Sequence, residues 1–172
     1  VRLHVKPRVP HGAAILLGYR EHADKPWIFQ VDADNEMPPD DFHALWARRA
    51  GHDLLLGRRD GGKRPFFRKI VSFFSRVVVG LFYGTGIHYV NSPYRLMRTS
   101  AFRRYFDLVP LDTIAPNLIL SGIACVKRLR IYEMPVAYAY RTTGAVSLNV
   151  MKMAGISLKS FVQTVRFRFL LR

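Results

Sequence analysis

The first sixty residues alternate between helix-like and strand-like apolar patterns. Residues 12–20 (GAAILLGYR) have helical spacing, whereas residues 27–31 (WIFQV) form a β-branched and aromatic run too short for a typical helix. A second helix is expected from about residue 40 to 50, and a second buried strand at residues 53–56 (DLLL). This order of strand, helix and strand predicts a parallel α/β unit.

Two kinds of residue mark the ends of the second helix. Asp40 or Asp41 can cap its N-terminus, because an Asp side chain accepts hydrogen bonds from the free backbone N–H groups there. Gly51 follows the last helical residue and favours termination. We therefore expect a capped helix of about ten residues.

The most apolar segment of the chain, residues 65–83, is interrupted by Arg68, Lys69 and Arg76. A membrane-spanning helix requires about 20 mostly apolar residues with few or no charges. The segment is therefore predicted to be a helix that lies on the core or on a bilayer surface.

The remaining apolar patterns predict helices at residues 99–107 and 114–128 and strands at residues 92–98 and 129–140. Residues 157–172 form a basic amphipathic helix, with Lys and Arg away from its apolar face. That apolar face consists of Leu158, Phe161, Val162, Val165 and Phe169.

Composition adds a bound on size and a strong charge signal. A chain of 172 residues with 49% hydrophobic content is long enough for one compact domain. Its net charge is +15, and residues 61–172 carry eighteen Lys or Arg against three acidic residues. Such a surplus indicates a phosphate-bearing partner, either nucleic acid, a nucleotide or an anionic membrane.

Two further features concern the chemistry and the limits of the chain. Cys125 is the single cysteine, which excludes a disulfide framework or a thiolate zinc site within the chain. The sequence begins without Met in the middle of a pattern, so we expect an N-terminal segment to be missing.

Three acidic residues, Asp32, Asp34 and Glu36, directly follow the first predicted strand. Their side chains are expected at the carboxyl edge of the sheet, where open α/β folds bind their ligands. Clustered carboxylates suit Mg²⁺ or Mn²⁺, which prefer oxygen ligands. The alternative is a solvated turn, because Asp and Asn also favour turns.

Two metal-dependent chemistries use such a carboxylate pair. Phosphatases of the haloacid dehalogenase type also carry Asp-x-Asp after a strand, but they continue with Thr or Val where this chain has Asn35, Glu36 and Met37. That difference disfavours the phosphatase. The other chemistry is sugar transfer from a nucleotide diphosphate, in which a metal neutralises the leaving group.

Five motifs in order make the second chemistry more specific: WIFQVDADNEMPPDDF, DLLLGRR, VNSPYRLMR, APNLILSGIA and RIYEMPVAYAYRTTGAVSLN. The chain thereby resembles the family 2 glycosyltransferases, in the branch of dolichyl- or polyprenyl-phosphate sugar transferases. The resemblance covers residues 11–149 and implies a three-layer α/β fold of the A-type, with a mainly parallel central sheet flanked by helices. The family's first strand–helix unit lies upstream of Val1 and is missing, so the fragment alone has an incomplete donor site and is expected to be inactive if that unit is required.

The domain boundary follows from the same comparison. Residues 1–149 are expected to form a partial catalytic domain, and residues 150–172 the basic amphipathic helix at a membrane interface. The resemblance implies a peripheral or tethered protein at the cytoplasmic face of the cell membrane.

The resemblance also implies roles for individual residues. Asp32, Asp34 and Glu36 would hold the metal, with Asp34 also catalytic and Asp32 also bound to the donor. The remaining substrate-binding residues would be Arg58, Arg59, Asn91, Arg95, Asn117, Arg141 and Ser147. Arg95 and Asn117 have structural alternatives, as a core-edge residue and as a helix N-cap.

One departure from the family concerns the acceptor. Relatives commonly carry an acidic residue just before the stretch that matches Asn91–Arg95, and this chain has none there; Asp112 is the replacement base that we consider, with a helix N-cap as its alternative. A hydroxyl acceptor needs a base, but a phosphate monoester is already ionised at neutral pH. We therefore predict a lipid-phosphate acceptor and inversion of the sugar.

Two alternatives remain open at this point. The basic clusters at residues 63–69 and 127–130 favour a nucleic-acid-binding protein, although this leaves the carboxylates unexplained. The missing acidic residue favours a catalytically inactive glycosyltransferase relative.

Overall fold

The computed structural model describes residues 9–34, 36–59, 66–139 and 150–171. Arg141 and Ser147, which we expected in the substrate site, lie outside these residues. The elements in chain order are α1 (His11–Glu21), β1 (Trp27–Gln30), η1 (Pro39–Asp41), α2 (Phe42–Arg48), η2 (Arg49–Gly51), β2 (Leu54–Arg59), α3 (Phe66–Tyr83), β3 (Arg95–Arg98), α4 (Thr99–Leu108), α5 (Pro116–Val126), β4 (Ile131–Val136) and α6 (Val150–Leu170).

The four strands form one mixed sheet in the order β1-β3-β2-β4. β3 is antiparallel to both of its neighbours, and β2 and β4 are parallel. The prediction of a mainly parallel sheet was therefore wrong. The predicted unit of β1, α2 and β2 is present, but β3 arrives from later in the chain and lies between the two strands.

The other three strands, β1, β2 and β4, all run in the same direction. Because β1 and β2 are each antiparallel to β3, they run the same way, and β4 runs with β2. The carboxyl ends of β1, β2 and β4 therefore meet at one edge of the sheet. The turn that holds Asp32 and Asp34 is at this edge, as predicted from the apolar run before it.

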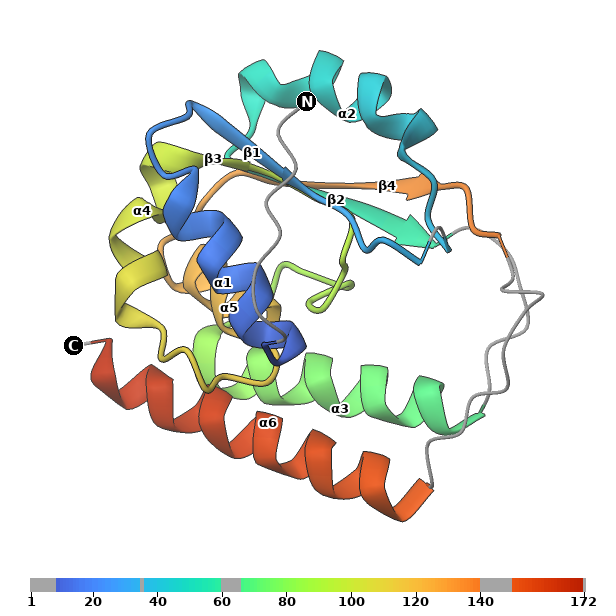
Figure 1. The fold of residues 1–172 in the computed structure, drawn as a ribbon, viewed down its shortest axis with the longest axis vertical. Helices are drawn as coiled ribbons and strands as arrows, with labels where there is room; N and C mark the ends of the chain where they lie inside the picture. Colours follow the sequence, from blue (N-terminus) through green and yellow to red (C-terminus); the bar gives the residue numbers. More distant parts are fainter. Residues whose placement is uncertain (1–8, 35, 60–65, 140–149, 172) are drawn as a thin grey trace.

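The central strand β2 is buried on both faces of the sheet, which explains its continuous apolar run of Leu54, Leu55 and Leu56. Leu54 and Leu56 of β2 pack into the core beneath α1, α3, α4 and α5, whereas Leu55 packs on the opposite side with Leu45 of α2. Figure 1 shows α2 on one face of the sheet and α1, α4 and α5 on the other. This helix–sheet–helix arrangement is compatible with the predicted three-layer fold.

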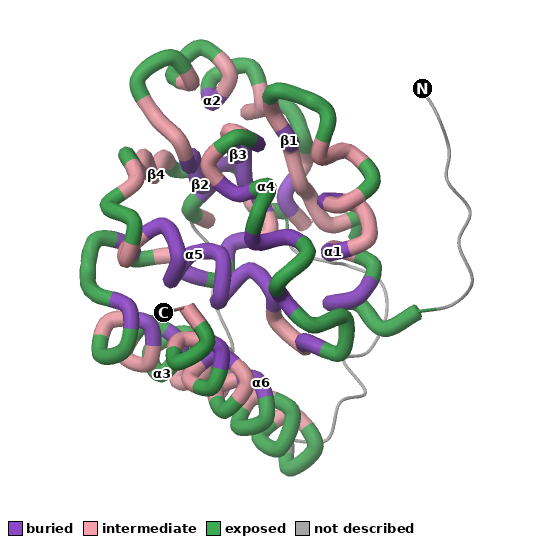
Figure 2. Tube along the Cα trace, turned by 90° about the vertical axis from the view of Figure 1, so that its left-hand side faces the viewer, coloured by how far each residue is buried: buried purple, intermediate pink, exposed green. Residues whose placement is uncertain are grey.

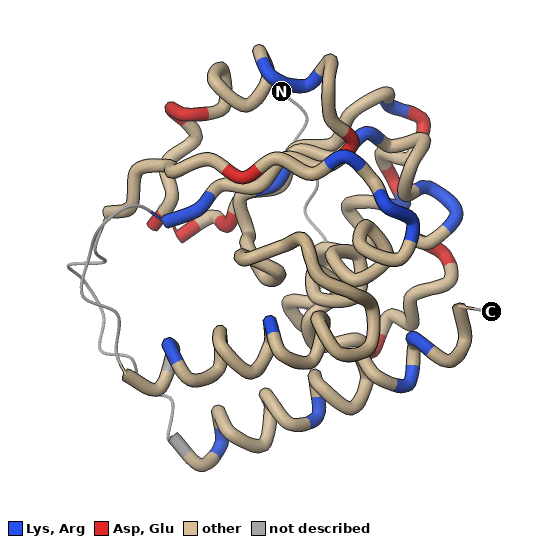
Figure 3. The backbone as a smooth tube through the Cα atoms, turned by 180° about the vertical axis from the view of Figure 1, so that it is seen from behind, with Lys and Arg blue, Asp and Glu red and all other residues tan. Residues whose placement is uncertain are grey.

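α3 and α6 form an additional layer beyond α5. α5 is buried along most of its length because the sheet covers one side of it and these two helices cover the other (Figure 2). Phe167 of α6 belongs to the same core as α5. Lys and Arg residues occur along both α3 and α6 (Figure 3). Within the described residues, neither helix nor any other is long and apolar enough to cross a membrane.

The predicted helix ends agree with the structure only in part. Asp41 is at the N-cap position of α2, as predicted, but its side chain makes no capping hydrogen bond; its Oδ2 instead accepts a hydrogen bond from the N–H of Ala137, 2.7 Å away beyond β4. Asn117 is not an N-cap, since α5 already begins at Pro116. α6 begins at Val150, where the predicted C-terminal helix of residues 150–172 starts, although its apolar face was assigned only from residue 157 onward. At Asp41 a tertiary hydrogen bond therefore takes the place of the local cap.

Gly57 allows a close approach at the carboxyl end of β2. A Cβ atom at this position would lie 2.8–2.9 Å from atoms of the Tyr94 side chain. The Gly57 N–H donates to the Tyr94 carbonyl at 2.7 Å, and its own carbonyl accepts from Ser92 Oγ at 2.7 Å. The glycine thereby brings the segment before β3 against the end of β2.

Candidate functional site

The two aspartates lie in a turn directly after β1. Asp32 is half-buried and Asp34 is exposed. Asp34 Oδ1 accepts a hydrogen bond from the backbone N–H of Glu36 at 3.1 Å. This bond fixes one oxygen of Asp34 within the turn and leaves the other oxygen for a ligand.

Asp32 is in surroundings that disfavour its negative charge. Partial burial is the main cause that raises the pKa of this carboxyl, and the charge of Asp34 raises it further. His11 and Arg59 act in the opposite direction without cancelling the effect. A cation placed between Asp32 and Asp34 would relieve this repulsion, which is how carboxylate metal sites form.

The donor set of the turn suits a hard divalent ion that keeps other ligands. In the described part of the chain, no group of three or more His, Cys, Asp or Glu residues is arranged to hold a metal. Two carboxylates with space for phosphate and water oxygens match the way Mg²⁺ is usually held beside a nucleotide. The residues therefore fit a metal shared with a diphosphate.

Glu36 forms contacts that the sequence does not suggest. Its Oε2 accepts a hydrogen bond from the Tyr138 hydroxyl at 3.1 Å and forms an ion pair with Arg59 at 3.4 Å. The Arg59 guanidinium also lies over the Tyr138 ring, 4.6 Å from its centre. In this arrangement Glu36 positions Arg59 through one oxygen, and its predicted role as a third metal ligand remains a prediction.

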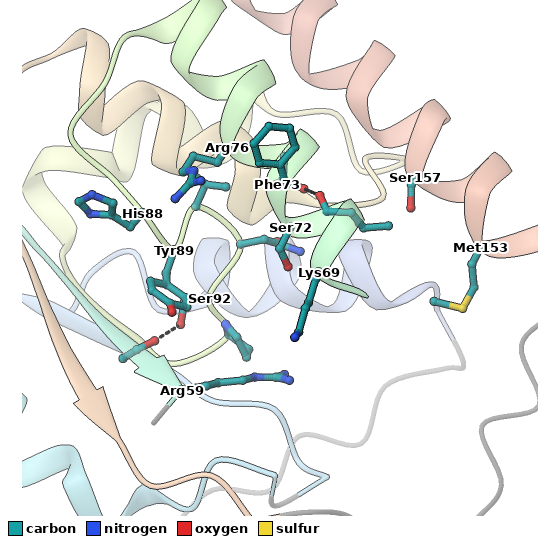
Figure 4. A pocket seen from close by; sticks show the side chains of 16 residues that line it. Arg59, Lys69, Ser72, Phe73, Arg76, His88, Tyr89, Ser92, Met153 and Ser157 are labelled. Carbon is teal, nitrogen blue, oxygen red and sulfur yellow. Dashed lines mark hydrogen bonds between the residues drawn. The ribbon is translucent and has the colours of Figure 1, made fainter. Parts of the chain in front are cut away.

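A cavity of about 450 Å³, here named the basic cavity, lies on the other side of Arg59. Its walls come from the end of β2, the loop of residues 88–93, α3 and the first half of α6. Four of its lining side chains are basic, namely Arg59, Lys69, Arg76 and His88. Arg59 and Lys69 extend into the same space from β2 and α3 (Figure 4). Such a site favours a phosphate group.

A second cavity of about 560 Å³, the α1–β1 groove, ends at Asp32. It is lined by one side of α1, including His11 and Tyr19, by the whole of β1, including Trp27, and by Lys25. Asp32 belongs to the lining of this groove, and Arg59 to that of the basic cavity. The acidic turn therefore separates two spaces that differ in polarity.

The loop of residues 88–93 is held from two sides. Glu133 of β4 accepts hydrogen bonds from the N–H groups of His88 at 3.0 Å and Tyr89 at 2.8 Å, and its second oxygen lies 2.9 Å from His88 Nδ1. Arg95 donates to the carbonyls of Ser92 at 3.0 Å and Val90 at 3.4 Å. The acid holds the amides of the loop and the arginine holds its carbonyls.

Arg95 is fully buried and lines neither cavity. Burial lowers the pKa of its guanidinium, which is nevertheless charged because arginine is a very strong base. Asn117, also buried, accepts from the Tyr19 hydroxyl at 3.1 Å, and the same hydroxyl bonds Gln30, the last residue of β1. In this conformation both predicted ligands position other groups, and neither lines a cavity.

The structure separates the other predicted residues into two groups. Asn91 and Arg59 line the basic cavity, as a substrate-binding role requires. Arg58 is exposed and lines neither cavity. Asp112 is exposed in the loop between α4 and α5, outside both cavities, where its carbonyl accepts a bond from Gln163 at 3.0 Å. The structure therefore does not place this candidate base at the site.

Sequence reasoning missed Lys69, Arg76 and Glu133. Lys69 and Arg76 are seven residues apart and therefore share a helix face, a spacing that would have identified them. Glu133 carried no such signal, because only the pairing of β4 with β2 brings it to residues 88 and 89.

No protein-family model matches the sequence, and no curated protein matches it either. The family resemblance consequently remains a prediction, and the functional argument depends on the site itself.

Proposed function

We propose that this protein is a metal-dependent glycosyltransferase that moves a sugar from a nucleotide diphosphate onto a phosphate-bearing lipid. The observation that supports this most strongly is the position of Arg59. It contacts the acidic turn through Glu36 and lines the basic cavity on its other side. This position supports a metal–diphosphate site that would be adjacent to a site for a second phosphate.

The donor is assigned to the side of the acidic turn that opens to the α1–β1 groove. Asp32 and Asp34 would hold Mg²⁺ or Mn²⁺, which neutralises negative charge on the diphosphate when bound. Arg59 is positioned by Glu36 and Tyr138 to bind phosphate oxygens from the opposite side. Because these groups are held before the substrate arrives, little reorganisation is needed.

The acceptor is assigned to the basic cavity. There Lys69, Arg76 and Asn91 would bind a phosphate monoester whose oxygen attacks the anomeric carbon. The bond from that carbon to the diphosphate oxygen breaks, and the diphosphate leaves with the electron pair. Attack from the side opposite the leaving group inverts the sugar. An ionised phosphate needs no proton acceptor, which agrees with the position of Asp112 away from the site.

The test is thermal unfolding of the full chain with Mn²⁺ and a nucleoside diphosphate, together and separately. We expect the pair to raise the Tm by several degrees at saturating ligand, since binding to the folded state stabilises it. Asp34→Ala should abolish this rise, while Asp24→Ala, which removes an exposed carboxylate that pairs with Lys25, should retain it. Equal stabilisation of Asp34→Ala would exclude the metal site.

The nucleic-acid alternative predicts a different result. A short RNA or DNA duplex would then stabilise the wild type and Asp34→Ala equally, without Mn²⁺, and the effect would decrease steeply with salt.

A further inference from the structure

Large exposed apolar side chains are concentrated on α3 and α6. Among the described residues, eleven of the fourteen exposed large hydrophobic side chains belong to these two helices. They are Phe66, Phe73, Phe74, Leu81, Phe82, Met151, Ile156, Leu158, Val162, Phe169 and Leu170. Single exposed apolar residues are normal on proteins, but a group of this size marks an interaction site.

The two helices lie side by side, and their exposed apolar side chains are here named the α3–α6 face. The Tyr83 hydroxyl donates to the Thr164 carbonyl at 2.6 Å, and Arg168 Nε donates to the Phe82 carbonyl at 2.8 Å. The rings of Phe82 and Phe169 meet edge to face with centres 6.5 Å apart. Figures 1 and 2 both show α3 and α6 side by side at the outside of the molecule.

The charge of the two helices favours a partner that carries negative charge. The two helices contain seven Lys or Arg residues and no Asp or Glu. A second copy of the chain would bring like charges together, which opposes self-association. An anionic lipid surface instead offers phosphates for the cations and acyl chains for the apolar side chains.

We propose that the α3–α6 face docks on an anionic membrane, with α3 and α6 both lying in the interfacial layer. Docking itself does not depend on the proposed reaction, but the delivery of a lipid acceptor to the basic cavity rests on the proposed function. Lys69 and Phe73 of α3 and Met153 of α6 line this cavity, so the cavity lies beside the docked surface. A lipid whose phosphate is at the headgroup level would reach the cavity without leaving the bilayer.

The first experiment measures binding of the full chain to phosphatidylcholine vesicles with and without phosphatidylglycerol. Binding should require the anionic lipid and decrease with salt. Replacing Lys152, Lys159 and Arg166 with Gln should weaken binding about a hundredfold, because each basic residue near an anionic membrane contributes about 1 kcal/mol. The matched control replaces Arg103, Arg104 and Lys127, which are exposed elsewhere, and should change binding less than about threefold.

A second pair of variants tests the apolar contribution at constant charge. Leu158 and Val162 are 65% and 46% exposed on α6, and Leu108 and Leu111 are 59% and 42% exposed at the end of α4 and in the following loop. Replacing Leu158 and Val162 with Ser should weaken binding about tenfold or more, since each inserted side chain leaves water. The same replacements at Leu108 and Leu111 should have no effect.

The proposal would be overturned if either control variant, the triple charge variant or the Leu108 and Leu111 variant, lost as much binding as its α6 counterpart. Equal binding to neutral vesicles would also overturn it. So would a dimer that Leu158→Ser and Val162→Ser dissociate while vesicles are not bound. If a multiple variant fails to fold, Phe74→Trp provides a second measurement. Its fluorescence should be quenched by brominated lipids, and that of Leu108→Trp should not; absence of this difference also contradicts docking. Stabilisation by Mn²⁺ and nucleoside diphosphate should be unchanged in the α6 variants, which separates this test from that of the reaction.

Discussion

The two ends of the central sheet hold carboxylates in opposite surroundings. At the start of β2, Asp53 accepts three hydrogen bonds of 3.1 Å from Arg130, two from its guanidinium and one from its backbone N–H, and forms an ion pair of 3.2 Å with Arg98. The Arg130 hydrogen bond is the main cause that lowers the pKa of Asp53. At the end of β1, burial raises the pKa of Asp32. The charge of the first carboxylate is stabilised by two arginines, whereas the second lies where its charge is disfavoured.

This contrast distinguishes a structural carboxylate from a candidate ligand-binding one. Asp53 connects β2 to β3 through Arg98 and to β4 through Arg130, so its charge stabilises the sheet. Asp32 destabilises the protein when it is ionised and no cation is present. Retaining such a group at the edge where three strands end is typical of functional sites.

Removal of Asp53 is expected to have the largest effect on stability. Asp53→Ala leaves the partly buried Arg98 without its carboxylate and should lower the free energy of unfolding by about 2–3 kcal/mol. Urea denaturation measures this change. Asp24→Ala, which removes an exposed pair with Lys25, should leave the midpoint unchanged. Equal losses of stability in both variants would show that the ion pairs of Asp53 at the start of β2 contribute no more than an exposed pair.

At the opposite end, Gly57 tests how closely the site is packed. Gly57→Ala places a Cβ against the Tyr94 ring and should cost about 2 kcal/mol of stability, because neither backbone nor ring has space to move freely. Gly51→Ala, where a Cβ meets nothing within 4 Å, is the control and should cost nothing. A tolerated Gly57→Ala would mean that Tyr94 does not fix the segment before β3.

A smaller loss of stability is expected when the loop of residues 88–93, which lines the basic cavity, loses its contact with Glu133. Glu133→Ala removes the acceptor for two backbone N–H groups and should cost about 1 kcal/mol, with a tenfold weaker affinity of the basic cavity for inorganic phosphate. Calorimetric titration measures the affinity. His88→Ala retains both backbone bonds to Glu133, so it should reduce phosphate affinity less than Glu133→Ala. The reverse order would assign binding to the imidazole and not to loop position.

Asp32→Asn should give the smallest change and the opposite sign. The folded-state pKa of Asp32 is raised above its ordinary value of 3.8, so stability falls as pH rises through the raised pKa. Asn removes that loss, and we expect a Tm about 1–3 °C higher at neutral pH without metal. Asp53 behaves in the opposite way, since its contribution is present above pH 3.8 and is lost as pH falls through its lowered pKa. A destabilised Asp32→Asn would contradict the contrast between the two ends.

Most helices and strands could be predicted from the sequence because their apolar periodicity is local. The runs at β1 and β2 and the amphipathic α3 were found close to their observed bounds. The direction of the sheet could not be predicted, since β3 is four residues long and its place between β1 and β2 depends on pairing across distant segments. Local periodicity contains no information about which strands become neighbours.

The candidate site divides in the same way. The position of Asp32 and Asp34 at the edge of the sheet could be predicted because a buried strand directly precedes them. The contacts of Glu36 with Tyr138 and of Glu133 with His88 join residues about a hundred and about forty-five positions apart, so no spacing rule reveals them. The positions of Arg95 and Asn117 were ambiguous for a different reason, because a polar residue in an apolar run fits a buried hydrogen bond as well as a ligand contact.

The place of β3 in the sheet also bears on how the protein forms during synthesis. β1 and β2 are made first, but the strand that joins them is residues 95–98, which follow the whole of α3. Until Arg98 has left the ribosome, the apolar edges of both strands remain unpaired, and such edges associate readily with other chains. A ribosome that pauses within α3 would leave β1 and β2 without this partner, whereas β1, β3 and β2 can pair once Arg98 has emerged from the ribosome.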